Sequence, residues 1–99
     1  MISFEQITKV FAFNIHKKYC IEIEFSIINN EKYDECWMGK TYDNNIEKDI
    51  YWFGLTPDGM NAYDYVSFEE MSEAPVFDGC SLKGVWDKVE IISINGCEL

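Results

Sequence analysis

An aromatic stretch near the middle of the chain restricts the fold more than any other feature. It runs from Asp49 to Val66, and its first part reads Asp-Ile-Tyr-Trp-Phe-Gly-Leu. Successive residues of a strand point to opposite faces, so a strand here carries bulky side chains on both faces. We therefore expect a strand that is covered on both sides. Pro57-Asp58-Gly59 then predicts a turn, because proline presets φ and glycine tolerates positive φ.

Strict alternation predicts another strand over residues 19–27. Hydrophobic side chains at every second position face one way, and Cys20, Glu22, Glu24 and Ser26 face the other way. A strand of this kind has one buried face and one face that is wet or contacts a partner.

The chain begins with the signature of a capped helix. Ser3 and Gln6 form a capping box, and hydrophobic residues at helical spacing then predict a helix over residues 4–15. The alternation from Phe11 to Ile15 leaves a strand there as an alternative. The other expected elements are strands over residues 33–42, 49–55 and 89–94, a short strand or ordered loop at 63–65, and short helices after Ser67 and Ser81.

These elements predict one α+β domain over residues 1–99, because half of such a chain would bury too little surface to fold alone. We expect a mainly antiparallel sheet of about four strands, with an N-terminal helix and two short helices before the last strand. The helices are expected on one face of the sheet. A parallel placement of the last strand also remains open, because a helical segment precedes it.

The charge is strongly negative and unevenly distributed. The net charge is −10, and residues 31–78 carry twelve acidic residues against three lysines. The chain contains no arginine, which argues against nucleic-acid binding, and its charge disfavours anionic membranes. No uncharged run approaches the roughly 18 residues of a membrane span. A basic protein is the partner that this charge favours, although acidity also serves solubility alone.

The cysteines and the N-terminus point to a cytoplasmic protein. Cys20, Cys36, Cys80 and Cys97 show no Cys-x-x-Cys spacing, so neither a zinc site nor a redox motif is expected. The chain lacks a basic segment followed by an apolar block near its start, so we expect no signal peptide and reduced thiols.

The polar run from Asp43 to Asp49 alternates oxygen-bearing side chains in the manner of a calcium loop. An EF-hand loop needs glycine at its sixth position and glutamate at its twelfth. Those positions hold Lys48 and Gly54. We therefore expect a solvated connection between strands, and no metal or cofactor.

Signals for catalysis are weak, which favours a protein that is not an enzyme. His16 and Cys20 are four positions apart, but the sequence offers no third group to orient such a pair. Asp64 lies between Tyr63 and Tyr65, whose rings could raise its pKa by desolvation. An exposed aspartate is the commoner outcome for such a residue.

Aromatic residues interleaved with acids suggest a protein-binding surface. Tryptophan and tyrosine anchor many interfaces, and a negative field around them suits a basic partner. In gross composition alone, the chain resembles small acidic inhibitor and immunity proteins that neutralise basic enzymes. The residues predicted to bind the partner are Asp34, Glu35, Asp43, Glu47, Asp49 and Asp64.

Two alternatives remain open. One is a small-molecule-binding domain or minor enzyme with an aromatic pocket near Trp52, Tyr63 and Asp64. The other is a homodimer joined through an exposed strand edge or an aromatic patch.

Overall fold

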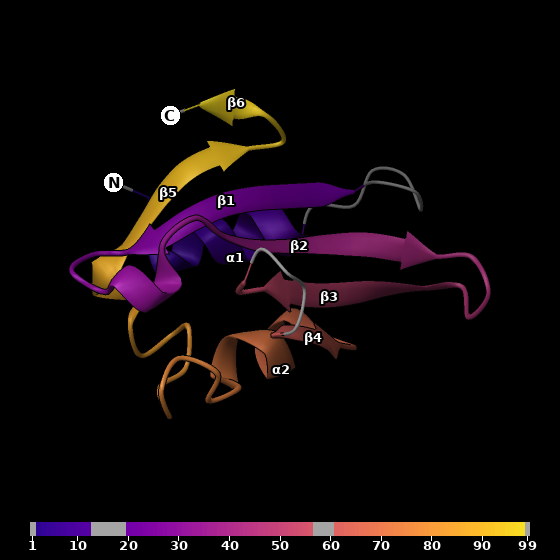
Figure 1. Ribbon diagram of the computed structural model, residues 1–99. Helices are drawn as coiled ribbons and strands as arrows, with labels where there is room; N and C mark the ends of the chain where they lie inside the picture. Colours follow the sequence, from indigo (N-terminus) through magenta and orange to yellow (C-terminus); the bar gives the residue numbers. More distant parts are fainter. Residues whose placement is uncertain (1, 13–19, 57–60, 99) are drawn as a thin grey trace.

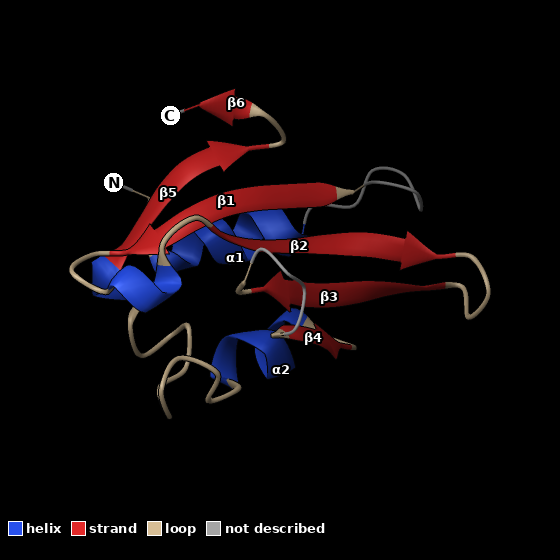
Figure 2. Cartoon of the chain, viewed as in Figure 1, coloured by secondary structure: helices blue, strands red, loops and turns tan. Residues whose placement is uncertain are grey.

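The fold is a twisted antiparallel sheet with helices on one face. A computed structural model describes residues 2–12, 20–56 and 61–98. Figure 1 shows α1 behind β1 and β2, with α2 beside β3 and β4, and Figure 2 separates helices from strands by colour. The elements are α1 (Phe4–Ala12), β1 (Ile21–Ile27), the 3-10 helix η1 (Glu31–Tyr33), β2 (Cys36–Asp43), β3 (Lys48–Gly54), β4 (Ala62–Tyr65), α2 (Phe68–Glu73), the 3-10 helix η2 (Trp86–Lys88), β5 (Val89–Ile94) and β6 (Cys97–Glu98).

The predicted α+β class is confirmed, but the sheet has more strands than the four expected. Its six strands follow the order β4-β3-β2-β1-β5-β6, and every neighbouring pair is antiparallel. The short strand expected near residues 63–65 forms as β4. Asn95 and Gly96 adopt positive φ values of 50° and 82°, which folds the chain back to form β6.

The parallel alternative for the last strand is wrong. After β4, which lies at one edge of the sheet, the chain passes through α2 and η2 and returns beyond β1, where β5 pairs antiparallel with β1. This connection from β4 to β5 crosses β3, β2 and β1, and it leaves β1 in the interior of the sheet.

A complete capping box begins α1 as predicted, and a serine N-cap begins α2. The Ser3 amide donates to Gln6 Oε1 at 2.8 Å, and the Gln6 amide donates to Ser3 Oγ at 3.1 Å. Helix α1 follows, so the strand alternative is wrong for residues 11–12, while residues 13–15 and His16 lie outside the described residues. Ser67 Oγ likewise accepts from the Glu70 amide at 3.1 Å and begins α2.

The segment after Ser81 forms turns followed by η2. Ser81 Oγ accepts from the Gly84 amide at 3.0 Å, and the buried Leu82 and Trp86 anchor the segment to the core. The Trp86 indole N–H donates to the Ile2 carbonyl at 3.0 Å and ties this segment to the start of the chain.

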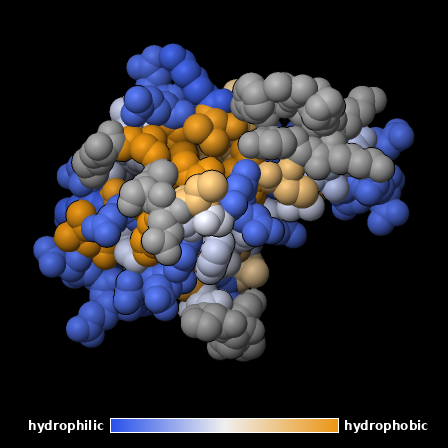
Figure 3. All heavy atoms as spheres, turned by 90° about the horizontal axis from the view of Figure 1, so that it is seen from above, coloured by the Kyte–Doolittle hydropathy of each residue, from blue (hydrophilic) through white to orange (hydrophobic). Residues whose placement is uncertain are grey.

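The main core lies between the sheet and the helices. From β1, Ile21, Ile23, Phe25 and Ile27 all point into it and are buried. Phe11 of α1 stacks on Phe68, with ring centroids 4.7 Å apart. Figure 3 shows that hydrophobic side chains also reach the surface in the middle of the view from above, with hydrophilic side chains around them.

The prediction that the aromatic strand is covered on both faces is wrong. Phe53 of β3 is buried on the helix side, but Ile50 and Trp52 point to the other side and remain partly exposed. No helix among the described residues covers that side. The Trp52 ring packs against the backbone of Gly39 on the neighbouring strand β2 and is partly buried there.

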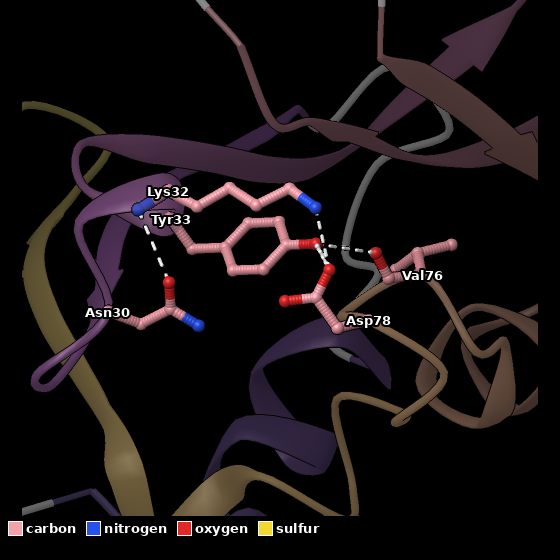
Figure 4. Close-up of polar contacts among 5 residues, drawn as sticks. All are labelled: Asn30, Lys32, Tyr33, Val76 and Asp78. Carbon is pink, nitrogen blue, oxygen red and sulfur yellow. Dashed lines mark hydrogen bonds and ion pairs between the residues drawn. The ribbon is translucent and has the colours of Figure 1, made fainter.

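A polar cluster fastens η1 to the loop that follows α2 (Figure 4). Lys32 Nζ donates to Asp78 Oδ1 at 2.6 Å, and the Tyr33 hydroxyl donates to the same oxygen at 3.2 Å. The hydrogen bond from Lys32 lowers the pKa of the Asp78 carboxyl, and the same bond raises the pKa of Lys32. This acid is therefore already neutralised within the fold.

No disulfide bond joins the four cysteines, all of which lie in the described part of the chain, and the environments of their thiols differ. The Cys36 thiol is buried and donates to the Leu55 carbonyl at 3.6 Å, whereas Cys80 and Cys97 are exposed. Burial raises the pKa of Cys36 from 9.0 to about 11. Only the thiolate reacts readily with alkylating reagents, so Cys36 has little reactive form at neutral pH.

We expect iodoacetamide at pH 8 to modify Cys80 and Cys97 in the native protein and Cys36 only after unfolding. Peptide mass mapping with and without urea measures this. Folding raises the pKa of Cys36, so the buried neutral thiol contributes fully to the free energy of unfolding below pH 9.0. This contribution is lost as the pH rises toward about 11. Prompt native modification of Cys36 would contradict the buried placement.

Among the described residues, no helix is both long enough and apolar enough to cross a membrane.

Candidate functional site

The side of the sheet that faces away from α1 and α2 is the candidate site, and we call it the open face. Alternation along β1 places Glu22 and Glu24 on it, because Ile21 and Ile23 point into the core. This agrees with the face that the sequence predicted to be wet or to contact a partner. The residues that define the open face are Glu22, Glu24, Trp37, Gly39, Trp52, Gly54, Ala62 and Asp64.

The strand register arranges these residues in two parallel rows. The first row crosses the strands β1, β2, β3 and β4 as Glu24, Trp37, Gly54 and Ala62. The second row crosses them as Glu22, Gly39, Trp52 and Asp64. Adjacent rows are two residues apart along each strand, which corresponds to roughly 6.6–6.8 Å. Each row therefore contains one indole, one cross-strand glycine and at least one carboxylate.

In the second row, the Trp52 indole lies directly on the Gly39 backbone. A Cβ atom at Gly39 would come within 2.5 Å of Trp52 Cζ2 and 2.1 Å of the Ile21 carbonyl oxygen. The indole N–H donates to Thr41 Oγ1 at 3.2 Å, which fixes the ring. Glycine is required here because a side chain would occupy the space of the ring.

In the first row, Trp37 is far less enclosed. Its side chain is 39% exposed, and a Cβ atom at the opposite Gly54 would lie 3.9 Å from Trp37 Cβ, in ordinary contact. Among the described residues, the Trp37 indole N–H has no hydrogen-bond partner. Trp37 thus presents both an apolar ring and an unused donor to the surroundings.

The carboxylates of the two rows are not neutralised within the described part of the chain. The ion pairs found there join Glu5 to Lys9 and Lys32 to Asp78, and neither pair lies in the rows. Glu22 and Asp64 are exposed, and Glu24 is half-buried beside Trp37. The rows therefore combine ring surface with uncompensated negative charge.

The structure brings some of the predicted partner-binding residues to the open face and leaves others elsewhere. Asp64 belongs to the second row, and Asp43 joins it and Trp52 in a hollow of about 550 Å³. Asp34 and Glu35 lie beyond the first row, beside Ser26, which donates to Asp34 at 2.9 Å.

The two remaining acids are separate from the rows. Glu47 lies in the β2–β3 turn with φ of 53°. Asp49 alternates with Ile50 and so points to the helix side of the sheet, where its Oδ1 atom is buried without a partner among the described residues.

The residues of the predicted ligand pocket do not converge. Trp52 and Asp64 are cross-strand partners on the open face, but Tyr63 pairs with Phe53 and so lies on the helix side. A different hollow, of about 400 Å³, lies between the helices and is lined mainly by Phe4, Phe11, Tyr51 and Phe68.

Sequence reasoning missed Trp37 as a surface residue. Its position in a strand was expected, but the face on which it lies depends on pairing with β1 and β3. No local signal identifies this face, because Trp37 lies between the hydrophobic Cys36 and Met38 in the sequence, and its pairing with Glu24 is known only from the structure.

No family model matches this chain, and neither a curated protein nor a solved structure matches it. Within residues 2–12, 20–56 and 61–98, no group of three or more His, Cys, Asp or Glu side chains could hold a metal ion.

Proposed function

We propose that this protein is a non-enzymatic, cytoplasmic protein-binding module whose open face docks a basic partner. Inhibition of a basic enzyme is one form that this function takes. The observation that carries the proposal is the pair of rows in which Trp37 and Trp52 stand beside the carboxylates of Glu22, Glu24 and Asp64.

The chemistry of the open face supports this function in two ways. Tryptophan is enriched among residues that dominate binding energy, and Trp37 is exposed without being needed to fill the main core. Carboxylates without internal partners favour a positive surface and accelerate its approach at low salt. A neutral or acidic partner would leave these charges buried and unpaired, which is costly.

We expect the double variant Glu24→Lys/Asp64→Lys to lose the partner. The test compares proteins captured from the native host by the wild type and by this variant. The matched control is Glu69→Lys/Glu73→Lys, which changes the net charge equally but alters exposed residues of α2 on the helix side. The wild type and the control should retain a basic protein, and raising the salt concentration should weaken its binding.

Two results would count against this function. If the open-face variant and the α2 control lose the captured protein to the same extent, net charge, and not the open face, attracts that protein. Binding that is insensitive to salt would remove the electrostatic basis of the proposal.

The hollow between α1 and α2 favours small-molecule binding as a second candidate function. Its aromatic lining and volume of about 400 Å³ suit a small apolar ligand. A fragment screen followed by NMR would test it. Chemical-shift changes confined to the resonances of Phe4 and Phe68 would support this function. The absence of such changes at millimolar concentrations of the fragments would contradict it.

A further inference from the structure

Trp37 is the more exposed of the two indoles in the rows, and its neighbour on β1 is Glu24. Trp37 and Glu24 are direct cross-strand partners in β2 and β1. Directly opposite residues of antiparallel strands have Cβ atoms roughly 4.5–5.5 Å apart. One bound group can therefore touch both the ring of Trp37 and the carboxylate of Glu24.

The rest of the first row leaves space beside the ring. Next to Trp37 come Gly54 and Ala62, so no described side chain of this row beyond Trp37 is larger than a methyl group. The Trp52 ring belongs to the second row, where it contacts Thr41 and Gly39, so a group can bind along the first row without displacing it. A long, slender side chain can thus lie along the first row toward Glu24.

The chemistry of the pair distinguishes between the two basic side chains. A guanidinium is planar, stacks on an aromatic ring, and offers a fork of donors that fits a carboxylate. An ammonium is more strongly hydrated and offers only a point charge. Trp37 provides the ring face and Glu24 the carboxylate, which is the combination that favours arginine.

We propose that the partner inserts an arginine whose guanidinium stacks on Trp37 and pairs with Glu24. This inference rests on the proposed function and names the group that the open face recognises. A second copy of this chain does not supply that group, because the sequence contains no arginine. A symmetric dimer through this face would also oppose carboxylates to carboxylates.

Short acetylated and amidated peptides of the form Gly-Arg-Ser-Arg-Gly provide the probe. The matched peptides replace arginine by lysine, which keeps the charge, or by citrulline, which keeps the shape and removes the charge. Binding is followed at low salt through the indole N–H resonances of the ¹⁵N-labelled protein. We expect the Trp37 resonance to shift most and the arginine peptide to bind about fivefold more tightly than the lysine peptide. The citrulline peptide should bind at least tenfold more weakly than the arginine peptide.

Variants of the pair test whether these two residues carry the preference. Trp37→Ala and Glu24→Gln should each abolish the arginine-over-lysine preference. The matched controls are Tyr63→Ala, an exposed aromatic on the helix side, and Glu90→Gln, an exposed acid of β5 outside the rows. Both controls should keep the preference, and amide spectra verify that every variant is folded.

The outcomes separate this inference from the proposed function. Equal affinity for the arginine and lysine peptides would overturn the arginine site, while selective loss of the captured partner by Glu24→Lys/Asp64→Lys would still support a basic partner. A preference that survives in Trp37→Ala, or the absence of binding by any peptide, would also overturn the arginine site.

Discussion

Gly39→Ala is expected to lower the free energy of unfolding by about 3 kcal/mol, at the upper end of what overpacking costs. The new Cβ atom would lie 2.1 Å from the Ile21 carbonyl oxygen and 2.5 Å from Trp52 Cζ2. The first of these atoms belongs to the backbone of the central strand β1, so a side-chain rotation does not relieve the contact. Urea unfolding followed by tryptophan fluorescence measures the loss.

Gly54→Ala is the matched control for this prediction. Gly54 also lies in the β2–β3 pair opposite a tryptophan, but its Cβ would meet Trp37 Cβ at 3.9 Å. We expect the free energy of unfolding to change by no more than about 0.5 kcal/mol. The new methyl group adds contacts and reduces the conformational freedom of the unfolded chain, and both effects offset a small strain in the strand. Equal losses for the two variants would mean that glycine is needed at both positions for backbone reasons and not to accommodate Trp52.

Phe11→Ala is expected to destabilise the protein by about 3–5 kcal/mol, the range for removing a buried phenylalanine. Phe11 is fully buried, stacks on Phe68 at 4.7 Å and lies 6.2 Å from the Tyr51 ring. Its backbone carbonyl also accepts from Lys40 Nζ at 2.7 Å, so the end of α1 is held to β2 near this ring. Loss of the ring leaves a cavity at the junction of both helices and the sheet.

Two comparisons sharpen the prediction for Phe11. Phe11→Leu retains most of the volume and should cost less than half as much. Tyr63→Ala removes an aromatic that is 40% exposed and should cost less than about 1 kcal/mol. Calorimetry or urea unfolding provides the values, and a loss below 1 kcal/mol for Phe11→Ala would contradict its place in the core.

Local sequence signals predicted the parts of the fold that depend on near neighbours. Ser3 and Gln6 identified the start of α1 because a capping box is complete within four residues. The alternation of Ile21, Ile23 and Phe25 with glutamates identified β1 and its two faces. Both signals are independent of how distant segments pair.

The features that sequence reasoning missed depend on distant pairing. Lys40 is 1% exposed and points to the helix side, although a lysine in an acidic segment gives no sign of burial. Its ammonium donates to the Phe11 carbonyl at the end of α1 and lies 5.8 Å from the Tyr51 ring. These partners are 29 and 11 positions away, so spacing along the chain does not reveal them.

The candidate site was predicted only in outline for the same reason. The expectation of acids beside aromatics led to Asp64 and Trp52, which the register makes direct partners. It grouped Tyr63 with them, although neighbouring strand residues point to opposite faces. Trp37 required knowledge of the β1–β2 register, which no local pattern supplies.

The exchanged order of tryptophan and glycine in the two rows also fixes how β2 and β3 align. In the observed register, Trp37 faces Gly54 and Gly39 faces Trp52. Sliding one strand by two positions would keep every side chain on its own face, yet it would bring the two indoles into opposition or leave the two glycines facing each other. These four residues lie on the open face, so a substitution among them that changes this face also changes how β2 and β3 align.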